Sequence, residues 1–448
     1  MARAFHDNLY RFDAAQPSYW EATASDRRMP AAPLGGAESC DVAVIGGGYT
    51  GLSTALHLAR DFGVDVRVLE AGPIGWGASG RNGGFCCIGG TGVHRRELVR
   101  LAGLEAAREY LAAQAGAVGL VRDLITAERI DCETNGDAEL EIAHTPRAFR
   151  RLEADHALLT GVLGRQAELV GAAECRARFY DSTETHGGLV TRPAFALHPL
   201  KYCLGLAAAA EKHGVRLHGN SEVLEWVRAG GRHRLATRGG TLAADRVVFA
   251  TNGFMPEDLN PAFFGRTIPV LSAIIVTRPL TADELAAQGW RTGDPAINSR
   301  RILNYFRLLP DGRFLLGGRG EVTGAPAREQ ETYRWLAATL GRVWPAWRDV
   351  RVDYRWHGLI CTTASLCPTL GRLDEDPSVF FAFGYHGNGV NTATWAGGQL
   401  AEWLGTGRAP PGLPAIVSGL SRRYPLPALR RSYLRLGLFI SRQLDRWY

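Results

Sequence analysis

A short apolar strand that runs into a glycine-rich turn constrains this chain more than any other feature of its sequence. Residues 41–46 read DVAVIG and residues 46–51 read GGGYTG. Apolar residues then recur at helical spacing from Leu52 to Ala59, and residues 66–71, VRVLEA, form a second apolar strand. This strand, turn, helix and strand unit is typical of a doubly wound α/β domain and has the order in which a nucleotide-binding glycine turn is found.

The glycines and one acid within this unit together form a nucleotide-binding motif. Gly46 permits the tight turn, Gly48 lets backbone N–H groups approach a pyrophosphate, and Gly51 allows the helix to pack closely. Glu70 ends the second strand, 19 residues after Gly51, where its carboxylate can accept both ribose hydroxyls. A carboxylate there disfavours a 2′-phosphate, so we expect FAD or NAD rather than NADP.

Three further glycine turns favour FAD over NAD. They lie at 75–84 (GWGASGRNGG), 250–253 (ATNG) and 383–390 (FGYHGNGV), near predicted strand ends. A single bound NAD needs only the first glycine turn, whereas a flavin that reaches another part of the chain uses several.

Length and composition exclude several classes of protein. A chain of 448 residues exceeds what one core needs, and the longest apolar run, 270–276, is far too short to span a bilayer. We therefore expect a soluble, cytoplasmic protein of two or more domains. The 8 cysteines contain no C-x-x-C pattern, so neither a disulfide framework nor a metal site is expected.

The net charge of +6 does not indicate a nucleic-acid partner, because the excess arginine forms no aromatic-interleaved stripe outside the C-terminus. Between residues 422 and 446, seven arginines surround apolar residues in a basic amphipathic pattern. We expect this terminal helix to dock on the body of the protein. Contact with a membrane surface or a partner protein is the alternative.

At this point the sequence resembles the FAD-dependent D-amino acid oxidase superfamily, which includes glycine oxidase and sarcosine oxidase. It is most similar to the gamma-glutamylputrescine oxidase branch. The likeness covers nearly the whole chain, and its motifs are CDVAVIGGGYTGLSTALHLA, VLEAGPIGWGASGRNGG, the HPL at 198, RILNYFRLLPDGR and GYHGNGVNTATWAG.

The resemblance implies a Rossmann-like FAD-binding domain and a substrate domain built on a mostly antiparallel sheet. We expect residues 1–37 to form an N-terminal arm. The FAD-binding domain is expected to be discontinuous, over 38–97, 198–253 and 355–410, and the substrate domain to use 98–197 and 254–354. Residues 411–448 are left for the basic C-terminal helix.

The resemblance also assigns cofactor contacts. Ala78, Ser79, Arg81, Asn82 and Gly84 match the segment along the pyrophosphate and flavin, Val223 matches the adenine side, and 387–390 match the loop over the flavin pyrimidine edge. The expected cofactor-binding residues are Gly46, Gly48, Tyr49, Thr50, Gly51, Glu70, Ala71, Gly77, Ala78, Ser79, Arg81, Asn82, Gly83, Gly84, Val223, Thr251, Asn252, Gly253, Gly358, Gly384, Gly387, Asn388, Gly389 and Val390.

The departures from the family pattern concern the substrate. Glycine oxidase and D-amino acid oxidase hold the substrate carboxylate with an arginine just after the W-x-G motif, where this chain has Leu359 and Ile360. Sarcosine oxidase uses an arginine and a lysine at positions that here read Phe85 and Asn391. We therefore expect an amine rather than an α-amino acid, unless Arg307 or Arg319 replaces the missing anchors.

Two other departures concern the flavin. The lysine that promotes reaction with oxygen in sarcosine oxidase corresponds to Leu315, which leaves open a dehydrogenase that uses another electron acceptor. The cysteine that binds flavin covalently in some sarcosine oxidases corresponds to Gly358, so non-covalent FAD is expected.

Catalytic candidates follow from position. Tyr305 and Arg307 precede the turn at 310–313 and Arg319 follows it, so strand alternation directs them into the cavity, and Tyr385 and His386 lie in the flavin loop. For Tyr305 and His386, core packing or a satisfied loop histidine is the alternative. Cys86 and Cys87 follow the glycine turn at 75–84, called the flavin turn below. They are interpreted as small buried apolar residues, with a place in the cavity lining as the alternative.

Together these patterns predict an FAD-dependent amine oxidase that forms an imine and, with oxygen, hydrogen peroxide. The alternatives are an amine dehydrogenase with a quinone or protein acceptor, an N-methyl or D-amino acid oxidase, and a non-catalytic FAD-binding subunit. The sequence does not identify the amine, the stereochemistry or the oligomeric state.

Overall fold

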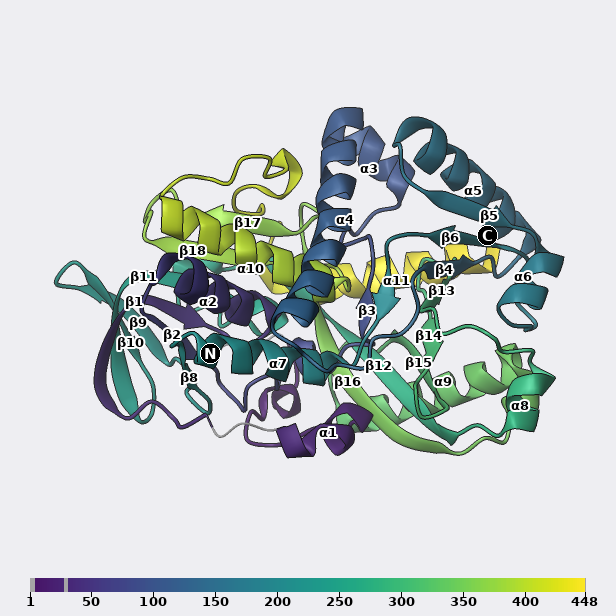
Figure 1. The fold of residues 1–448 in the computed structure, drawn as a ribbon, viewed down its shortest axis with the longest axis horizontal. Helices are drawn as coiled ribbons and strands as arrows, with labels where there is room; N and C mark the ends of the chain where they lie inside the picture. Colours follow the sequence, from purple (N-terminus) through teal and green to yellow (C-terminus); the bar gives the residue numbers. More distant parts are fainter. Residues whose placement is uncertain (1–4, 28–30, 448) are drawn as a thin grey trace.

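The computed structural model describes residues 5–27 and 31–447 and contains two eight-stranded sheets (Figure 1). We call the region where the two sheets meet the seam. Residues 1–4 and 28–30 of the predicted N-terminal arm, and residue 448, lie outside the described residues. No helix in the described part of the chain has the length and apolar character that a membrane span requires.

The first sheet contains the glycine turn. The strand β1 (Gly36–Ile45) pairs in parallel with β2 (Val66–Leu69) and with β11 (Gly240–Phe249). The remaining strands are β18 (Val379–Phe383) and β17 (Thr369–Arg372) beyond β11, β8 (Arg216–His218) beyond β2, and the hairpin β9 (Glu225–Ala229) and β10 (Arg232–Ala236) on β11. A mostly parallel sheet is buried on both faces, which explains the continuous apolar run of β1.

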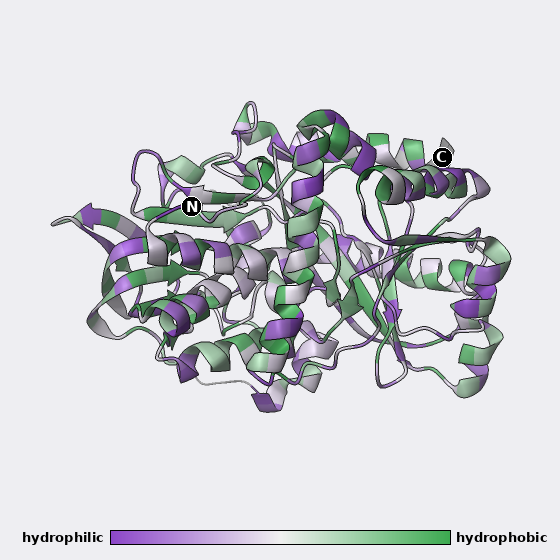
Figure 2. Cartoon of the chain, turned by 45° about the horizontal axis from the view of Figure 1, so that its top comes forward, coloured by the Kyte–Doolittle hydropathy of each residue, from purple (hydrophilic) through white to green (hydrophobic). Residues whose placement is uncertain are grey.

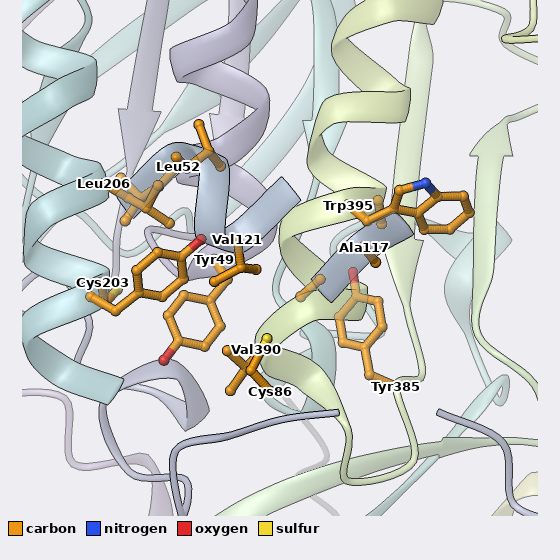
Figure 3. Packing of buried hydrophobic residues seen from close by; sticks show 14 of the residues in the cluster. Tyr49, Leu52, Cys86, Ala117, Val121, Cys203, Leu206, Tyr385, Val390 and Trp395 are labelled. Atoms are coloured by element: carbon orange, nitrogen blue, oxygen red, sulfur yellow. The ribbon is translucent and has the colours of Figure 1, made fainter. Parts of the chain in front are cut away.

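Helices cover one face of this sheet. The helix α2 (Tyr49–Phe62) packs against α7 (Pro199–Lys212) and α10 (Gly389–Thr406). The long helix α4 (Leu104–Ala127) packs on α10, and its alternating hydrophilic and hydrophobic bands are visible in Figure 2. Figure 3 shows the resulting core, in which Cys86 lies beside Val390.

The second sheet is mostly antiparallel, as expected. Its strands in spatial order are β16 (Val352–Thr363), β12 (Thr267–Pro279), β15 (Arg313–Arg319), β14 (Tyr305–Leu308), β13 (Ala296–Asn298), β4 (Glu139–Ile142), β6 (Gly188–Thr191) and β5 (Ala167–Val170). Only the pair β13–β4 is parallel among these neighbours. Alternation divides β12, since Ala273 and Ile275 face an aromatic core and Ile274 and Val276 face the first domain.

The aromatic core lies between the second sheet and α9 (Pro326–Val343). Trp347 is completely buried there, its ring centroid 4.8 Å from that of Phe314 and 5.7 Å from that of Trp290. Its indole N–H donates to the carbonyl of Glu284 at 2.8 Å. This core fixes the outer face of the sheet and leaves the opposite face for the seam.

The remaining elements complete the chain. They are α1 (Tyr19–Thr23), β3 (Phe85–Cys86), α3 (Arg95–Ala102), α5 (Pro146–Ala157), α6 (Ala172–Arg178), β7 (Phe195–Ala196), α8 (Ala282–Ala287) and α11 (Arg430–Trp447). As expected, the terminal helix α11 lies against the body, where Arg430 pairs with Glu257 and Leu434 packs near Leu271.

Two details differ from the sequence-based division into domains. Residues 352–363 belong to the second sheet as β16, although we assigned 355–410 to the FAD-binding domain. The C-terminal helix begins at Arg430, and residues 411–429 precede it without a long helix. The apolar alternation of β16 is compatible with either sheet. Its antiparallel pairing with β12 assigns it to the second sheet.

We predict that Trp347→Ala destabilises the protein by about 3–5 kcal/mol, because it removes a large side chain from a packed core. Trp335→Ala is the control, since Trp335 lies on α9 and is 46% exposed; it should destabilise the protein clearly less than Trp347→Ala, because less apolar surface returns to water. Apparent melting temperatures measure both effects. Equal losses for the two variants would contradict the assignment of this core.

Candidate active site

A cavity of about 610 Å³ lies between the two sheets. One wall is built by the glycine turn after β1, the end of β2 and the segment 76–91. The other wall is the inner face of the second sheet, with contributions from the loop at 385–390 and from α11. The cavity therefore lies at the carboxyl ends of parallel strands, where doubly wound folds bind their ligands.

The three fingerprint glycines are required by close approach. A Cβ on Gly51 would lie 2.0 Å from the Gly46 carbonyl oxygen, and a Cβ on Gly46, whose φ is +114°, would lie 2.7 Å from the Ala250 oxygen. A Cβ on Gly48 would lie 2.8 Å from the Ser79 hydroxyl. Only glycine lets β1, α2 and the flavin turn meet at these distances.

Glu70 lines the cavity at the end of β2. Its carboxylate accepts the backbone N–H of Gly47 at 2.6 Å and that of Gly72 at 3.2 Å. Burial raises the pKa of Glu70, while these N–H groups act in the opposite direction. The acid is thus fixed against the glycine turn, in the position predicted for a ribose-binding carboxylate.

The turn at 81–83 is held by three donors from three separate segments. The indole of Trp356 on β16 donates to the Arg81 carbonyl at 2.8 Å, and the indole of Trp20 on α1 donates to the Asn82 carbonyl at 2.9 Å. Arg307 on β14 donates from Nε to the Gly83 carbonyl at 2.9 Å. Three successive carbonyls therefore tie the flavin turn to the second sheet and to the N-terminal arm.

Buried polar atoms without partners mark where a polar ligand fits. The Arg81 side chain stacks over the Trp76 ring at 3.9 Å and donates from Nε to the Trp76 carbonyl. Its Nη2 atom and the Thr251 hydroxyl have no hydrogen-bond partner among the described residues, although both residues line the cavity. Buried donors of this kind are costly unless a ligand satisfies them, so the glycine cradle and these groups fit a pyrophosphate-containing cofactor.

Twenty of the 24 residues predicted to bind the cofactor line this cavity. The four that do not are Gly51, Gly84, Gly253 and Gly384. Gly84 and Gly384 have φ values of +76° and +83°, and Gly51 packs against Gly46. These glycines therefore support the backbone that lines the cavity without lining it themselves. Direct contact of the twenty with the cofactor stays a prediction.

Two catalytic candidates lie on the inner face of the second sheet. The hydroxyl of Tyr305 lies 2.8 Å from that of Ser272 on β12, and its ring occupies the space that a side chain at Gly317 would fill. Burial raises the pKa of Tyr305 to about 12, so the phenol stays protonated at neutral pH. Arg319, at the end of β15, also lines the cavity.

The prediction that Arg307 points into the cavity is wrong. Arg307 is completely buried, is not among the cavity-lining residues, and donates to the carbonyls of Gly83 and Leu197. Strand alternation correctly predicted that Arg307 and Tyr305 lie on the same face of β14. Arg307, however, is two residues further along the strand, where this face packs against the first domain and not against the cavity. The two sheets already enclose this arginine, so it does not replace the missing carboxylate anchors.

Tyr385 and His386 line the cavity, but their side chains contact residues of α2 and β16. The Tyr385 hydroxyl lies 2.6 Å from that of Thr50, and His386 Nε2 lies 3.2 Å from the Thr363 hydroxyl. Burial lowers the pKa of His386 to about 4, so this histidine is neutral near pH 7. Both side chains have the contacts expected of structural residues that shape the loop.

Sequence reasoning missed much of the wall formed by the second sheet and the C-terminus. The missed residues include Ser272, Ile274, Ile297, Ile302, Leu303, Glu139 and Arg95, with Leu438 and Ser441 from α11. These residues lie on β4, β12, β13, α3, α11 and the loop before β14, which are far apart in sequence, so no local motif marks them. The alternation of β12 was the one available signal for Ser272 and Ile274.

The comparisons with known proteins agree with this geometry. Residues 41–403 match the family model DAO, described as FAD dependent oxidoreductase. The chain belongs to this family. It is therefore an oxidoreductase with FAD as its cofactor.

Individual relatives support the same fold. The chain is 32% identical over 393 residues to gamma-glutamylputrescine oxidoreductase of Escherichia coli (strain K12), covering 86% of this chain and 88% of the relative. Among solved structures, glycine oxidase from Geobacillus kaustophilus superposes with a TM-score of 0.71 at 20% identity, covering 87% of this chain and 100% of that one. L-proline dehydrogenase from P. horikoshii gives a TM-score of 0.68 at 19% identity, with coverages of 90% and 99%.

We predict that Gly51→Ala loses bound FAD, because the new Cβ would lie 2.0 Å from the Gly46 carbonyl oxygen and separate α2 from the turn. Gly116→Ala on α4 is a matched control, since an added Cβ there meets nothing within 4 Å. The ratio of flavin absorbance to protein after purification measures retention. Full flavin content in Gly51→Ala would contradict the assigned cradle.

Proposed function

We propose that this protein oxidises the C–N bond of an amine to an imine, which water then hydrolyses, with oxygen as the acceptor that becomes hydrogen peroxide. The observation that carries the proposal is the composition of the cavity wall. Phe85, Leu359 and Ile360 line it at positions where relatives that oxidise α-amino acids were expected to have basic anchors. An apolar wall there suits an amine that has no carboxylate beside its nitrogen.

The residues of the second sheet suit the binding of a neutral amine. When bound, FAD supplies a two-electron acceptor that takes a hydride from the carbon beside the nitrogen. Ile274 and Ile297 provide an apolar surface that disfavours the charged ammonium form. The paired hydroxyls of Tyr305 and Ser272 can accept or donate one hydrogen bond to the substrate and so orient it.

The named relative extends the proposal to a substrate class. Gamma-glutamylputrescine oxidoreductase acts, by its name, on an acylated diamine, and the chain matches it over 86% of its length. We propose polyamine derivatives, or other primary and secondary amines, as substrates. An N-methyl or D-amino acid oxidase would need a carboxylate anchor, for which Arg319 is the cavity-lining candidate.

The helix α11 favours a second candidate, an amine dehydrogenase that works at a membrane surface. Its inner side supplies Leu438 and Ser441 to the cavity, while Leu436, Phe439 and Ile440 are exposed on its outer side. Exposed apolar residues within a basic helix are typical of interfacial binding. A lipid-soluble quinone would then replace oxygen as the electron acceptor.

We propose that FAD is held without a covalent bond, because Gly358 has no thiol at the position where some relatives attach their flavin. Cys361 also lines the cavity, so it is the one neighbouring thiol on β16 that could form a link. Acid precipitation should leave the flavin in the supernatant. Flavin that remains with the pellet in wild type, and is released in Cys361→Ser, would contradict the proposal.

The amine-oxidation proposal is tested by anaerobic bleaching of the flavin. We expect 1,4-diaminobutane, its gamma-glutamyl derivative or another amine in a broad panel to bleach the absorbance near 450 nm, since an amine within the cavity reduces the cofactor. D-amino acids and N-methyl amino acids complete the panel. No bleaching by any member would contradict the proposal and leave a non-catalytic FAD-binding subunit.

Admission of air distinguishes the two acceptors. Prompt recovery of the yellow colour with one hydrogen peroxide per amine supports the oxidase. Slow recovery in air, with fast recovery on addition of a soluble quinone, supports the dehydrogenase. Co-sedimentation with anionic vesicles, and its loss in Phe439→Ser, would connect the second outcome with α11.

A further inference from the structure

The wall of the cavity formed by the second sheet carries a buried acid that the proposed chemistry does not use. Glu139 begins β4, is 6% exposed, and lines the cavity. Alternation along β4 places Glu139 and Glu141 on the inner face, while Leu140 and Ile142 enter the aromatic core on the other face. Glu139 therefore faces the cavity because of its strand register.

The arginines near Glu139 pair with other carboxylates. Arg95 pairs with Glu141 at 2.9 Å and with Asp155 at 3.7 Å, and Arg96 lies 3.4 Å from Asp155. Both arginines are therefore engaged by Glu141 and Asp155. Within the described part of the chain Glu139 makes no ion pair within 4.0 Å, so its carboxyl group faces the cavity without a paired cation.

The other neighbours of Glu139 do not supply a paired cation either. The Cys87 thiol is a weak hydrogen-bond partner, and Arg95 acts on Glu139 only at longer range. Burial raises the pKa of Glu139 to about 7. A buried carboxylate in this state is stabilised by any cation that enters the cavity beside it.

The sheet register places Glu139 at a distance from the expected reaction site. Tyr305 pairs with Ile297, and Ile297 pairs with Glu141, so these residues form one row across β14, β13 and β4. Glu139 lies two strands across and two residues along from Tyr305, a Cα separation of about 12 Å from standard sheet spacings. A ligand that reaches both must extend along the wall.

We propose that Glu139 binds a second, cationic group of the substrate, so that the enzyme prefers amines with a further ammonium group over monoamines of the same length. This inference rests on the proposed function, because it names the substrate class of the same site. The carboxylate holds the distal ammonium while the reacting nitrogen lies near Tyr305 and Ser272. Charge-assisted hydrogen bonds of this type are among the stronger polar contacts available to a ligand.

The test measures binding without turnover. Dithionite-reduced holoenzyme cannot oxidise an amine, so its dissociation constants for 1,4-diaminobutane and butylamine are determined under argon by calorimetry. At pH 8.5 the Glu139 carboxylate is charged and the distal ammonium is still protonated. We expect wild type to bind the diamine at least tenfold more tightly than butylamine.

The variants assign that preference to one residue. Glu139→Gln should abolish it, and Glu139→Asp, which keeps the charge, should keep part of it. Glu128→Gln is the control, since the Glu128 side chain is only 6% exposed but pairs with Arg60 outside the cavity; it should keep the full preference. Equal binding of the two amines by wild type, or an unchanged preference in Glu139→Gln, would overturn the proposal.

The outcomes separate this inference from the proposed function. A Glu139-dependent preference without flavin bleaching by any amine would support the binding site and contradict amine oxidation. Bleaching by mono- and diamines alike, with no effect of Glu139→Gln, would support amine oxidation and contradict the Glu139 binding site. If Glu139→Gln does not fold, the wild-type comparison and Glu139→Asp decide, because a wild type without preference contradicts the proposal by itself.

Discussion

The structure depends on three hydrogen bonds that converge on consecutive carbonyls of the flavin turn. Arg81, Asn82 and Gly83 each offer a backbone oxygen to a different segment, and the donors are the indoles of Trp356 and Trp20 and the guanidinium of Arg307. Leaving a buried carbonyl unsatisfied costs about 1–3 kcal/mol. The two sheets and the arm are therefore fixed relative to one another at the point where the cofactor must lie.

This seam also explains why an arginine from the second sheet is structural. Arg307 and Tyr305 lie on the same face of β14, two residues apart. The cavity ends between them, so Tyr305 meets the cavity while Arg307 meets the carbonyls of Gly83 and Leu197. Burial lowers the pKa of Arg307 to about 10, which leaves it charged at neutral pH and able to strengthen these bonds.

The sequence predicts the first wall of the site well and the second wall poorly. The fingerprint from Gly46 to Gly51, with Glu70, is local, and its conformation follows from steric limits at the glycines. Glu139 and Ile297 line the same wall only because β4 and β13, far apart in the chain, pair in one register. Such pairing depends on packing across the whole sheet, so it cannot be predicted from a short sequence motif.

The same reasoning applies to the boundary at β16 and to α11. The apolar strand at 352–363 could be placed in either sheet from its pattern, and its pairing with β12 assigns it to the second. The docking of α11 was expected from its amphipathic pattern. Its contribution of Leu438 and Ser441 to the cavity was not expected, because a helix pattern does not say which surface it covers.

The most direct measurement of the central claim is a crystal structure of the dithionite-reduced holoenzyme with 1,4-diaminobutane bound. The account predicts that the flavin ring lies against the loop at 385–390 and that the amine lies between this ring and the wall containing Tyr305 and Ser272. A flavin outside the cavity between the two sheets, or an amine bound away from that wall, would contradict it.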